Sequence, residues 1–161
     1  PAALNSSTKK VGVLATKGTL NSPLFKETSA TYGKSVETIT VVGKGLVQLI
    51  ESGKTNSEEM TELLKEYLAP MIQAEVDHIV LGCTHYPFLK EQIQMLTPRT
   101  VKIIDSGKPV AKQTQRILAK YHLGANETAN EPHAFYVNGN TAVCESFLRR
   151  MGISNYTIRS L

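Results

Sequence analysis

The stretch Asp77-His78-Ile79-Val80-Leu81-Gly82-Cys83-Thr84-His85-Tyr86-Pro87 decides the fold that this chain can adopt. Its apolar run, residues 79–81, is short, continuous and closed by a glycine, which is typical of a buried strand. Pro87 then stands where a helix would have its first turn, a position that proline favours. The stretch therefore predicts a strand over residues 77–81, a turn and a helix, which together form the repeating unit of a parallel α/β sheet.

Outward from this stretch, strands and helices continue to alternate along the chain. Apolar or β-branched runs predict further strands at residues 10–16, 36–42 and 100–104. The helices predicted from apolar spacing and capping residues cover residues 23–33, 46–53, 57–72, 86–96 and 109–121. This order predicts the α/β class, with a parallel sheet between helices in a three-layer, Rossmann-like domain.

The C-terminal part repeats the alternation on a smaller scale. Residues 124–133 lack periodicity and predict a loop. A strand at residues 135–137, a helix at 141–151 and a last strand at 156–159 follow it. At 161 residues the chain can bury one sizeable core, or one domain and part of another.

Composition and charge exclude several classes of protein. With 41% hydrophobic and 20% charged residues, the chain has the composition of a soluble globular protein. It has no apolar run long enough for a membrane span and no signal-peptide pattern. Two cysteines do not make a disulfide framework, so we expect a reducing, cytoplasmic location.

The net charge of +4 does not by itself predict an anionic macromolecular partner. The basic residues are scattered, and only Lys9-Lys10 and Arg149-Arg150 are adjacent pairs. Aromatic residues make up 6% of the chain and are not interleaved with a basic stripe. We therefore expect neither nucleic acid nor a membrane as partner.

Cys83 and His85 are the strongest candidates for chemistry. They follow a predicted strand, and ligands of open α/β sheets bind beyond the carboxyl ends of the strands. A histidine two residues from a thiol can accept or return its proton. From the residues alone, an inert cysteine beside a surface histidine explains the pattern equally well.

A second candidate is the turn Thr16-Lys17-Gly18-Thr19, which follows the first strand. Its hydroxyls and backbone amides suit a carboxylate or phosphate, although an ordinary strand-to-helix turn has the same composition. No metal site is predicted, because the remaining histidines and Cys144 form no second ligand pair. Cys144 itself lies in a predicted helix and is expected to pack there.

The segment Gly82-Cys83-Thr84-His85-Tyr86-Pro87 resembles the C-terminal catalytic motif of glutamate racemases, in the aspartate/glutamate racemase superfamily. Other segments resemble landmarks of that family in the family's order. They are Lys10-Val11-Gly12-Val13-Leu14-Ala15-Thr16-Lys17-Gly18-Thr19 with Ser22, Leu49-Ile50-Glu51-Ser52-Gly53, Ile103-Ile104-Asp105-Ser106-Gly107 and Phe135-Tyr136-Val137-Asn138-Gly139. The resemblance covers essentially the whole chain.

The resemblance implies a racemase that works without pyridoxal or any other cofactor and interconverts L- and D-glutamate, supplying D-glutamate for peptidoglycan. By this resemblance Cys83 is one of two catalytic thiols and acts on the L-isomer face. His85 would assist its proton transfers, and Glu51 would tune the charge near His85. Substrate-binding roles would fall to Thr84, His85, Thr16 and Thr19.

The chain also departs from the family pattern. Where the family shows Cys-Pro and a further Pro before the glutamate, this sequence has Gly43-Lys44 and Gln48. The family's N-terminal Asp-Ser-Gly turn and Cys-Asn-Thr motif are absent from these residues. Residues 1–8 are mostly small or polar and predict a loose lead-in. The resemblance implies a complete α/β domain at 9–105 and a tail at 106–161 that completes an N-terminal domain. We expect such a chain to be inactive alone.

Several alternatives stay open at this point. Aspartate racemase is a close neighbour with the same chemistry. Cys83 and His85 could instead form the nucleophile pair of a hydrolase or transferase, for which the sequence shows no third orienting residue. A non-catalytic binding module and a homodimer are further possibilities.

Overall fold

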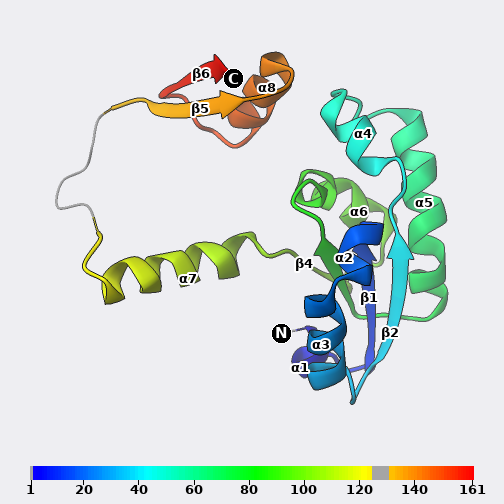
Figure 1. Cartoon of the computed structure of the whole chain (residues 1–161). Coiled ribbons are helices and arrows are strands. Elements are labelled where there is room, and N and C mark those ends of the chain that lie inside the picture. Colours follow the sequence, from blue (N-terminus) through cyan, green and yellow to red (C-terminus); the bar gives the residue numbers. More distant parts are fainter. Residues whose placement is uncertain (1, 125–130) are drawn as a thin grey trace.

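A four-stranded parallel sheet forms the centre of the molecule. The structure, a computed structural model, describes residues 2–124 and 131–161. The strands are β1 (Lys10–Ala15), β2 (Glu37–Val42), β3 (His78–Gly82) and β4 (Lys102–Ile104). They lie in the order β2-β1-β3-β4, and every neighbouring pair is parallel (Figure 1). The predicted α/β class is confirmed.

One face of this sheet carries the hydrophobic core. Alternate strand residues such as Leu14, Ile79 and Leu81 point toward it, since successive side chains of a strand face opposite sides. The helices α4 (Leu46–Glu51), α5 (Glu58–Gln73) and α6 (Lys90–Leu96) supply the other half of the core. Gly12 makes room for Met71 of α5, because a Cβ at Gly12 would lie 2.6 Å from the Met71 sulfur.

The opposite face is covered less completely. It carries α1 (Ala2–Asn5), α2 (Lys17–Asn21) and α3 (Pro23–Tyr32), and α2 and α3 contain no buried residue. An apolar groove of about 590 Å³ remains between α1, α3 and the sheet. The helices on the two faces complete the three layers that the sequence predicts.

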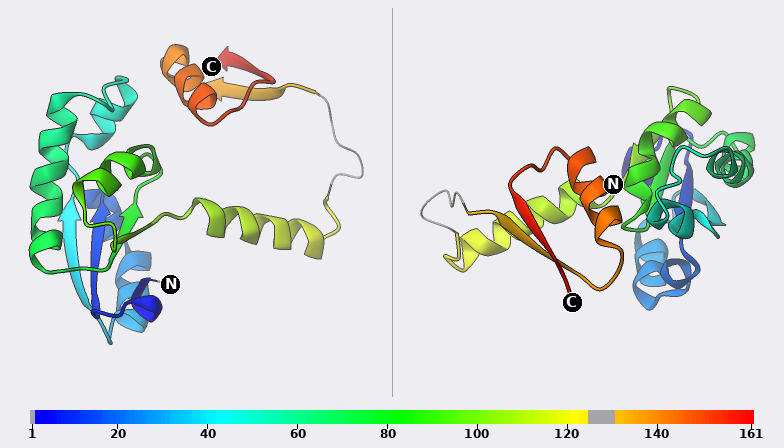
Figure 2. Two further views of the ribbon diagram at one scale, coloured as in Figure 1. Left: turned by 180° about the vertical axis from the view of Figure 1, so that it is seen from behind. Right: turned by 90° about the horizontal axis from the view of Figure 1, so that it is seen from above.

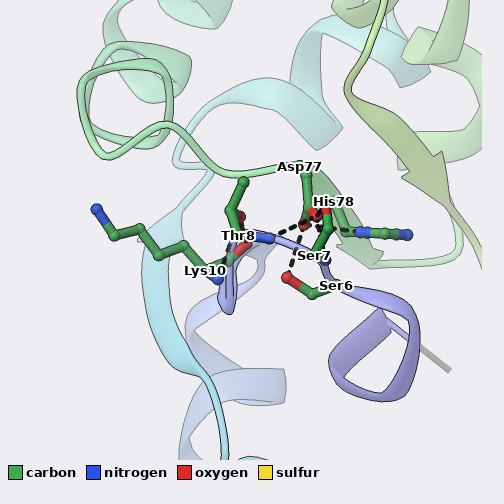
Figure 3. A network of polar contacts seen from close by, with 6 residues as sticks. All are labelled: Ser6, Ser7, Thr8, Lys10, Asp77 and His78. Atoms are coloured by element: carbon green, nitrogen blue, oxygen red, sulfur yellow. Dashed lines mark hydrogen bonds and ion pairs between the residues drawn. The ribbon is translucent and has the colours of Figure 1, made fainter.

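The N-terminal residues are fastened to the sheet, which corrects the expectation of a loose lead-in. Ser6 Oγ, Ser7 N and Oγ, and Thr8 N all donate to the Asp77 carboxylate, at 2.6 to 3.1 Å (Figure 3). His78 Nδ1 lies 2.8 Å from the same carboxylate. Burial opposes ionisation of Asp77, yet these hydrogen bonds together hold its pKa well below the usual range.

The C-terminal part has its own small sheet. Helix α7 (Gly107–Lys120) leads to β5 (His133–Val137), α8 (Thr141–Arg150) and β6 (Tyr156–Ser160), and β5 pairs with β6 in parallel. In both views of Figure 2, α7 projects away from the four-stranded sheet. The loop predicted over residues 124–133 falls largely outside the described residues.

The C-terminal part contacts the larger sheet domain through α8. The rings of Phe147 and Phe88 stack with centroids 4.2 Å apart. Arg150 donates to the Phe88 carbonyl at 3.2 Å and to Thr55 Oγ1 at 3.3 Å, and its guanidinium lies over the Phe88 ring. An aromatic stack and a cation–π contact therefore join the two parts.

Two helix starts differ from the predictions. The helix expected from residue 86 begins as the 3₁₀ helix η1 (Tyr86–Leu89), with Tyr86 N bonded to Cys83 O and Phe88 N to His85 O. These bonds close over three residues, so the first turn is tighter than an α-helix. Helix α7 begins at Gly107 rather than 109, because Asp105 Oδ1 accepts from Gly107 N at 2.9 Å.

Within the described residues, no helix combines the length and the apolar character needed to cross a bilayer.

Candidate functional site

The candidate site lies where β1 and β3 end side by side. Ala15 and Gly82 are paired in register as the last residues of these strands. A Cβ at Gly82 would lie 2.7 Å from Ala15 Cβ and 3.4 Å from Thr19 Cγ2. Glycine therefore lets the loop that carries Cys83 approach the turn after β1, at the edge where ligands of parallel sheets bind.

Cys83, His85 and Glu51 form a continuous row of side chains at this edge. Cys83 Sγ lies 4.0 Å from His85 Nδ1, and His85 Nε2 lies 3.0 Å from Glu51 Oε1. An ionised carboxylate only accepts, so in the neutral imidazole this contact favours the tautomer with the hydrogen on Nε2 and the Nδ1 lone pair toward the thiol. His85 is thus oriented to accept a proton from Cys83. The Glu51 side chain is 58% exposed, so solvent screens the charge that it presents to His85.

The predicted threonines line one cleft together with Cys83 and His85, whereas Glu51 lies outside its lining. Thr16, Thr19, Cys83, Thr84 and His85 all border a cleft of about 810 Å³. The turn predicted at residues 16–19 is the start of α2, with Thr16 as its N-cap and Thr19 inside the helix. Thr16 Oγ1 lies 3.0 Å from Thr19 Oγ1 and accepts from Thr19 N at 3.3 Å, so this helix start holds both hydroxyls in a fixed arrangement. Thr84 Oγ1 lies 3.5 Å from His85 Nδ1. The cleft therefore combines a thiol, an imidazole and hydroxyls, which suit a small polar ligand.

Asp105 and Ser106 border the same cleft, although the sequence suggested them only as a family landmark at a strand end and not as site residues. The hydrogen bond from Gly107 N is the main cause that lowers the pKa of the Asp105 carboxyl, against the effect of burial and with help from Lys90. Lys90 Nζ lies 3.1 Å from Asp105 Oδ2. The sequence signal that could have identified them as site residues is their position directly after β4, because the ends of neighbouring parallel strands meet at one edge of the sheet.

A second cavity of about 460 Å³ is lined by both His85 and Glu51. It is bordered by the turn between β5 and α8 and by Cys144. Cys144 is half-buried, so it contributes to a cavity wall as well as to the packing expected of it. His78 lies at the opposite end of β3, where it bonds Asp77. Across residues 2–124 and 131–161, no three His, Cys, Asp or Glu side chains are grouped to hold a metal ion.

Comparison with known proteins shows the family of this chain. Residues 1–114, which include all the predicted site residues, match the family described as Asp/Glu/hydantoin racemase. The chain belongs to this racemase family. Glutamate racemases are among its relatives: that of Pseudomonas syringae pv. tomato is 42% identical over 131 residues, covering 81% of this chain and 48% of the relative. That of Pseudomonas entomophila is 36% identical over 160 residues, covering 99% of this chain and 60% of the relative.

Solved racemase structures share the fold. Escherichia coli glutamate racemase, in complex with L-glutamate and the activator UDP-MurNAc-Ala, superposes with a TM-score of 0.80 at 26% identity, over 100% of this chain and 61% of that one. Francisella tularensis glutamate racemase, in complex with D-glutamate, gives a TM-score of 0.79 at 27% identity, over 99% and 60%. This racemase-family chain thus spans about half the length of the curated relatives it matches.

Proposed function

We propose that the chain is part of a glutamate racemase that uses no cofactor, acts in the cytoplasm and supplies D-glutamate for peptidoglycan. The observation that carries this proposal is the row Cys83–His85–Glu51 in a racemase-family domain, in which Cys83 and His85 border the cleft. The names of the relatives support glutamate as the substrate. Aspartate remains the alternative within the same chemistry.

In the proposed mechanism, Cys83 exchanges a proton with one face of the substrate Cα. The thiol passes its proton to His85 Nδ1, and the resulting thiolate removes the Cα proton. Glu51 holds the imidazole in the tautomer that can accept, and it stabilises the imidazolium that forms. Hydroxyls of Thr84, Thr16 and Thr19, together with His85, bind the substrate's polar groups. Inversion then requires a second acid/base group that protonates the opposite face.

From the same family resemblance, we infer how the chain is divided into domains. Residues 9–105 form the complete α/β domain, with residues 1–8 as its lead-in. Residues 106–161 complete a second, similar domain that carries the other acid/base group. The shares of the relatives that this chain covers support this division. The 161-residue chain is therefore expected not to racemise glutamate alone.

Two measurements test the proposal. In a Cys144→Ser background, iodoacetamide should modify Cys83, and L-glutamate should slow the reaction more than L-aspartate does. Equal rates with and without either amino acid would contradict an acidic amino acid as ligand. The circular dichroism of L-glutamate incubated with the unmodified chain should stay constant. Its decay would contradict the requirement for a second group.

A hydrolase or transferase is a second candidate, and Glu51 is the observation that favours it. The sequence shows no third orienting residue, whereas the structure places the Glu51 carboxylate on His85. A nucleophile, a base and an orienting carboxylate are the parts of a covalent catalyst. This candidate predicts a burst of phenol release from an activated ester that Cys83→Ala abolishes, and the racemase proposal predicts none.

A non-catalytic binding module is distinguished by the same variant. Its ligand binding would survive Cys83→Ala and would not depend on His85 or Glu51.

A further inference from the structure

The turn between β2 and α4 is held by two tyrosine hydroxyls. Tyr86 Oη donates to the Gly43 carbonyl at 2.9 Å, and Tyr67 Oη donates to the next carbonyl, that of Lys44, also at 2.9 Å. The first hydrogen bond is buried and the second is exposed. The buried one is harder to replace, because water cannot reach the atoms that it would leave unpaired.

The turn itself depends on glycine. Gly45 has a φ of +84°, in the left-handed region, and forms the N-cap of α4. Gly43 leaves no space for a side chain, since a Cβ there would lie 2.5 Å from Tyr86 Oη and 2.7 Å from Leu46 Cδ1. Residues 43–45 are therefore fitted closely to the Tyr86 hydroxyl.

This turn sets the place of Glu51. Helix α4 is a single short element, and its buried side chains Leu46, Leu49 and Ile50 tie it to the core. Glu51 is its last residue. Any displacement of the turn at the start of α4 thus moves the carboxylate at its end.

Tyr86 acts on both partners of the Glu51–His85 pair. It directly follows His85 in the chain, and its ring is fully buried. Its backbone N–H bonds Cys83 O, which closes the loop that carries Cys83 and His85. Its hydroxyl, meanwhile, holds the turn that leads to Glu51. Burial, and then the nearby Cys83 charge, raise the pKa of Tyr86, so the hydroxyl stays a donor.

We propose that Tyr86 is a positioning residue, which holds α4 through the Gly43 carbonyl so that Glu51 orients His85. The proposal rests on the proposed function for its catalytic meaning, but the geometry can be measured without turnover.

The test is nitrogen NMR of the histidine rings in the whole chain labelled with ¹⁵N-histidine. The signals of His85 are assigned with His85→Asn, and Glu51→Gln shows the spectrum of an imidazole without its carboxylate. In Tyr86→Phe, the ratio of the Nε2–H to the Nδ1–H tautomer of His85 should fall about fivefold, the effect of one lost hydrogen bond. Tyr67→Phe is the matched control: it removes the hydroxyl from the adjacent, exposed carbonyl and should leave the ratio unchanged.

A second variant disturbs the turn without touching the core. Gly45→Ala strains the left-handed residue, while its Cβ would meet only Leu63 Cδ1 at an ordinary 3.5 Å. It should move the His85 signals in the same direction as Tyr86→Phe. If Tyr86→Phe does not fold, Gly45→Ala decides alone. A folded variant of either kind with wild-type His85 signals would overturn the proposal. A lack of racemase activity would not overturn the positioning proposal, because neither NMR measurement involves glutamate.

Discussion

The region up to β4 and the region from α7 onward are built from similar elements but differ in what they bury. The first region encloses a core in which side chains such as Leu64, Leu68 and Ile79 are completely inaccessible to solvent. In the described part of the second region, Leu148 is the one buried residue. Its helix α7 instead exposes Val110, Ile117 and Leu118 along one side.

This difference teaches that alternation of strand and helix does not guarantee a domain. A two-stranded parallel sheet with one helix has too little apolar surface to enclose, whereas four strands between two helical layers have enough. An exposed apolar stripe on a helix indicates a surface that packs against something else. This agrees with the proposal that residues 106–161 complete a second domain.

The largest effect is expected from truncating the enclosed core. Leu64→Ala should lower the free energy of unfolding by about 3 kcal/mol, because it leaves a cavity in a fully buried site. Ile117→Ala, on the stripe of α7, should change it by less than about 0.5 kcal/mol. Urea unfolding followed by circular dichroism measures both. Similar losses of unfolding free energy from the two variants would contradict the view that only the first region encloses a core.

A smaller effect is expected where polar contacts fasten the N-terminus to the first region. Asp77→Asn should cost about 2 kcal/mol at neutral pH, since the charged acceptor of several hydrogen bonds is lost. The folded pKa of Asp77 lies below its unfolded value, so its stabilisation is present above about pH 4 and is lost as the pH falls further.

Urea midpoints between pH 2 and 7 check this prediction. The wild type should lose more stability on acidification than Asp77→Asn does. Glu62→Gln, at an exposed surface pair, serves as the control and should leave the profile unchanged. Parallel profiles for wild type and Asp77→Asn would show that the carboxylate contributes no pH dependence.

The smallest effect is expected at the joint between the regions. Phe147→Ala removes the ring stacked on Phe88 and should weaken the contact by about 1 kcal/mol. The first region should unfold at the same urea concentration, while protease cleaves the second region faster. Met151→Ala, at a side chain 61% exposed, is the control. An unchanged rate of cleavage would mean that the stack does not hold α8 in place.

Much of the fold of the first region could be predicted from its sequence. Buried parallel strands are continuous apolar runs, so β1 and β3 stand out in the sequence. The edge strand β2 has no buried residue and stands out by its β-branched residues instead, and all four strands were predicted within a residue or two of their observed bounds. Local contacts altered the helix starts, as at Asp105 and Pro87. The fastening of residues 6–8 could not be foreseen, because Asp77 lies about 70 residues further along the chain.

The candidate site also has a part that the sequence predicts and a part that it does not. Cys83 and His85 are two residues apart, so their proximity follows from the sequence. The approach of Glu51 to His85 spans 34 residues and depends on how α4 is anchored, so only the family resemblance suggested it. To predict that Asp105 and Ser106 lie at the site, one must know that β4 neighbours β3, and the periodicity of the sequence alone does not give this strand order.

Gly82 has a consequence for the shape of this site. A methyl group at position 82 would lie 2.7 Å from Ala15 Cβ, so the ends of β1 and β3 meet where it would not fit. The width of the cleft at this edge therefore depends on the absence of a single methyl group at position 82. Alanine at position 82 would push the ends of β1 and β3 apart, so a single substitution at this position would change the width of the cleft.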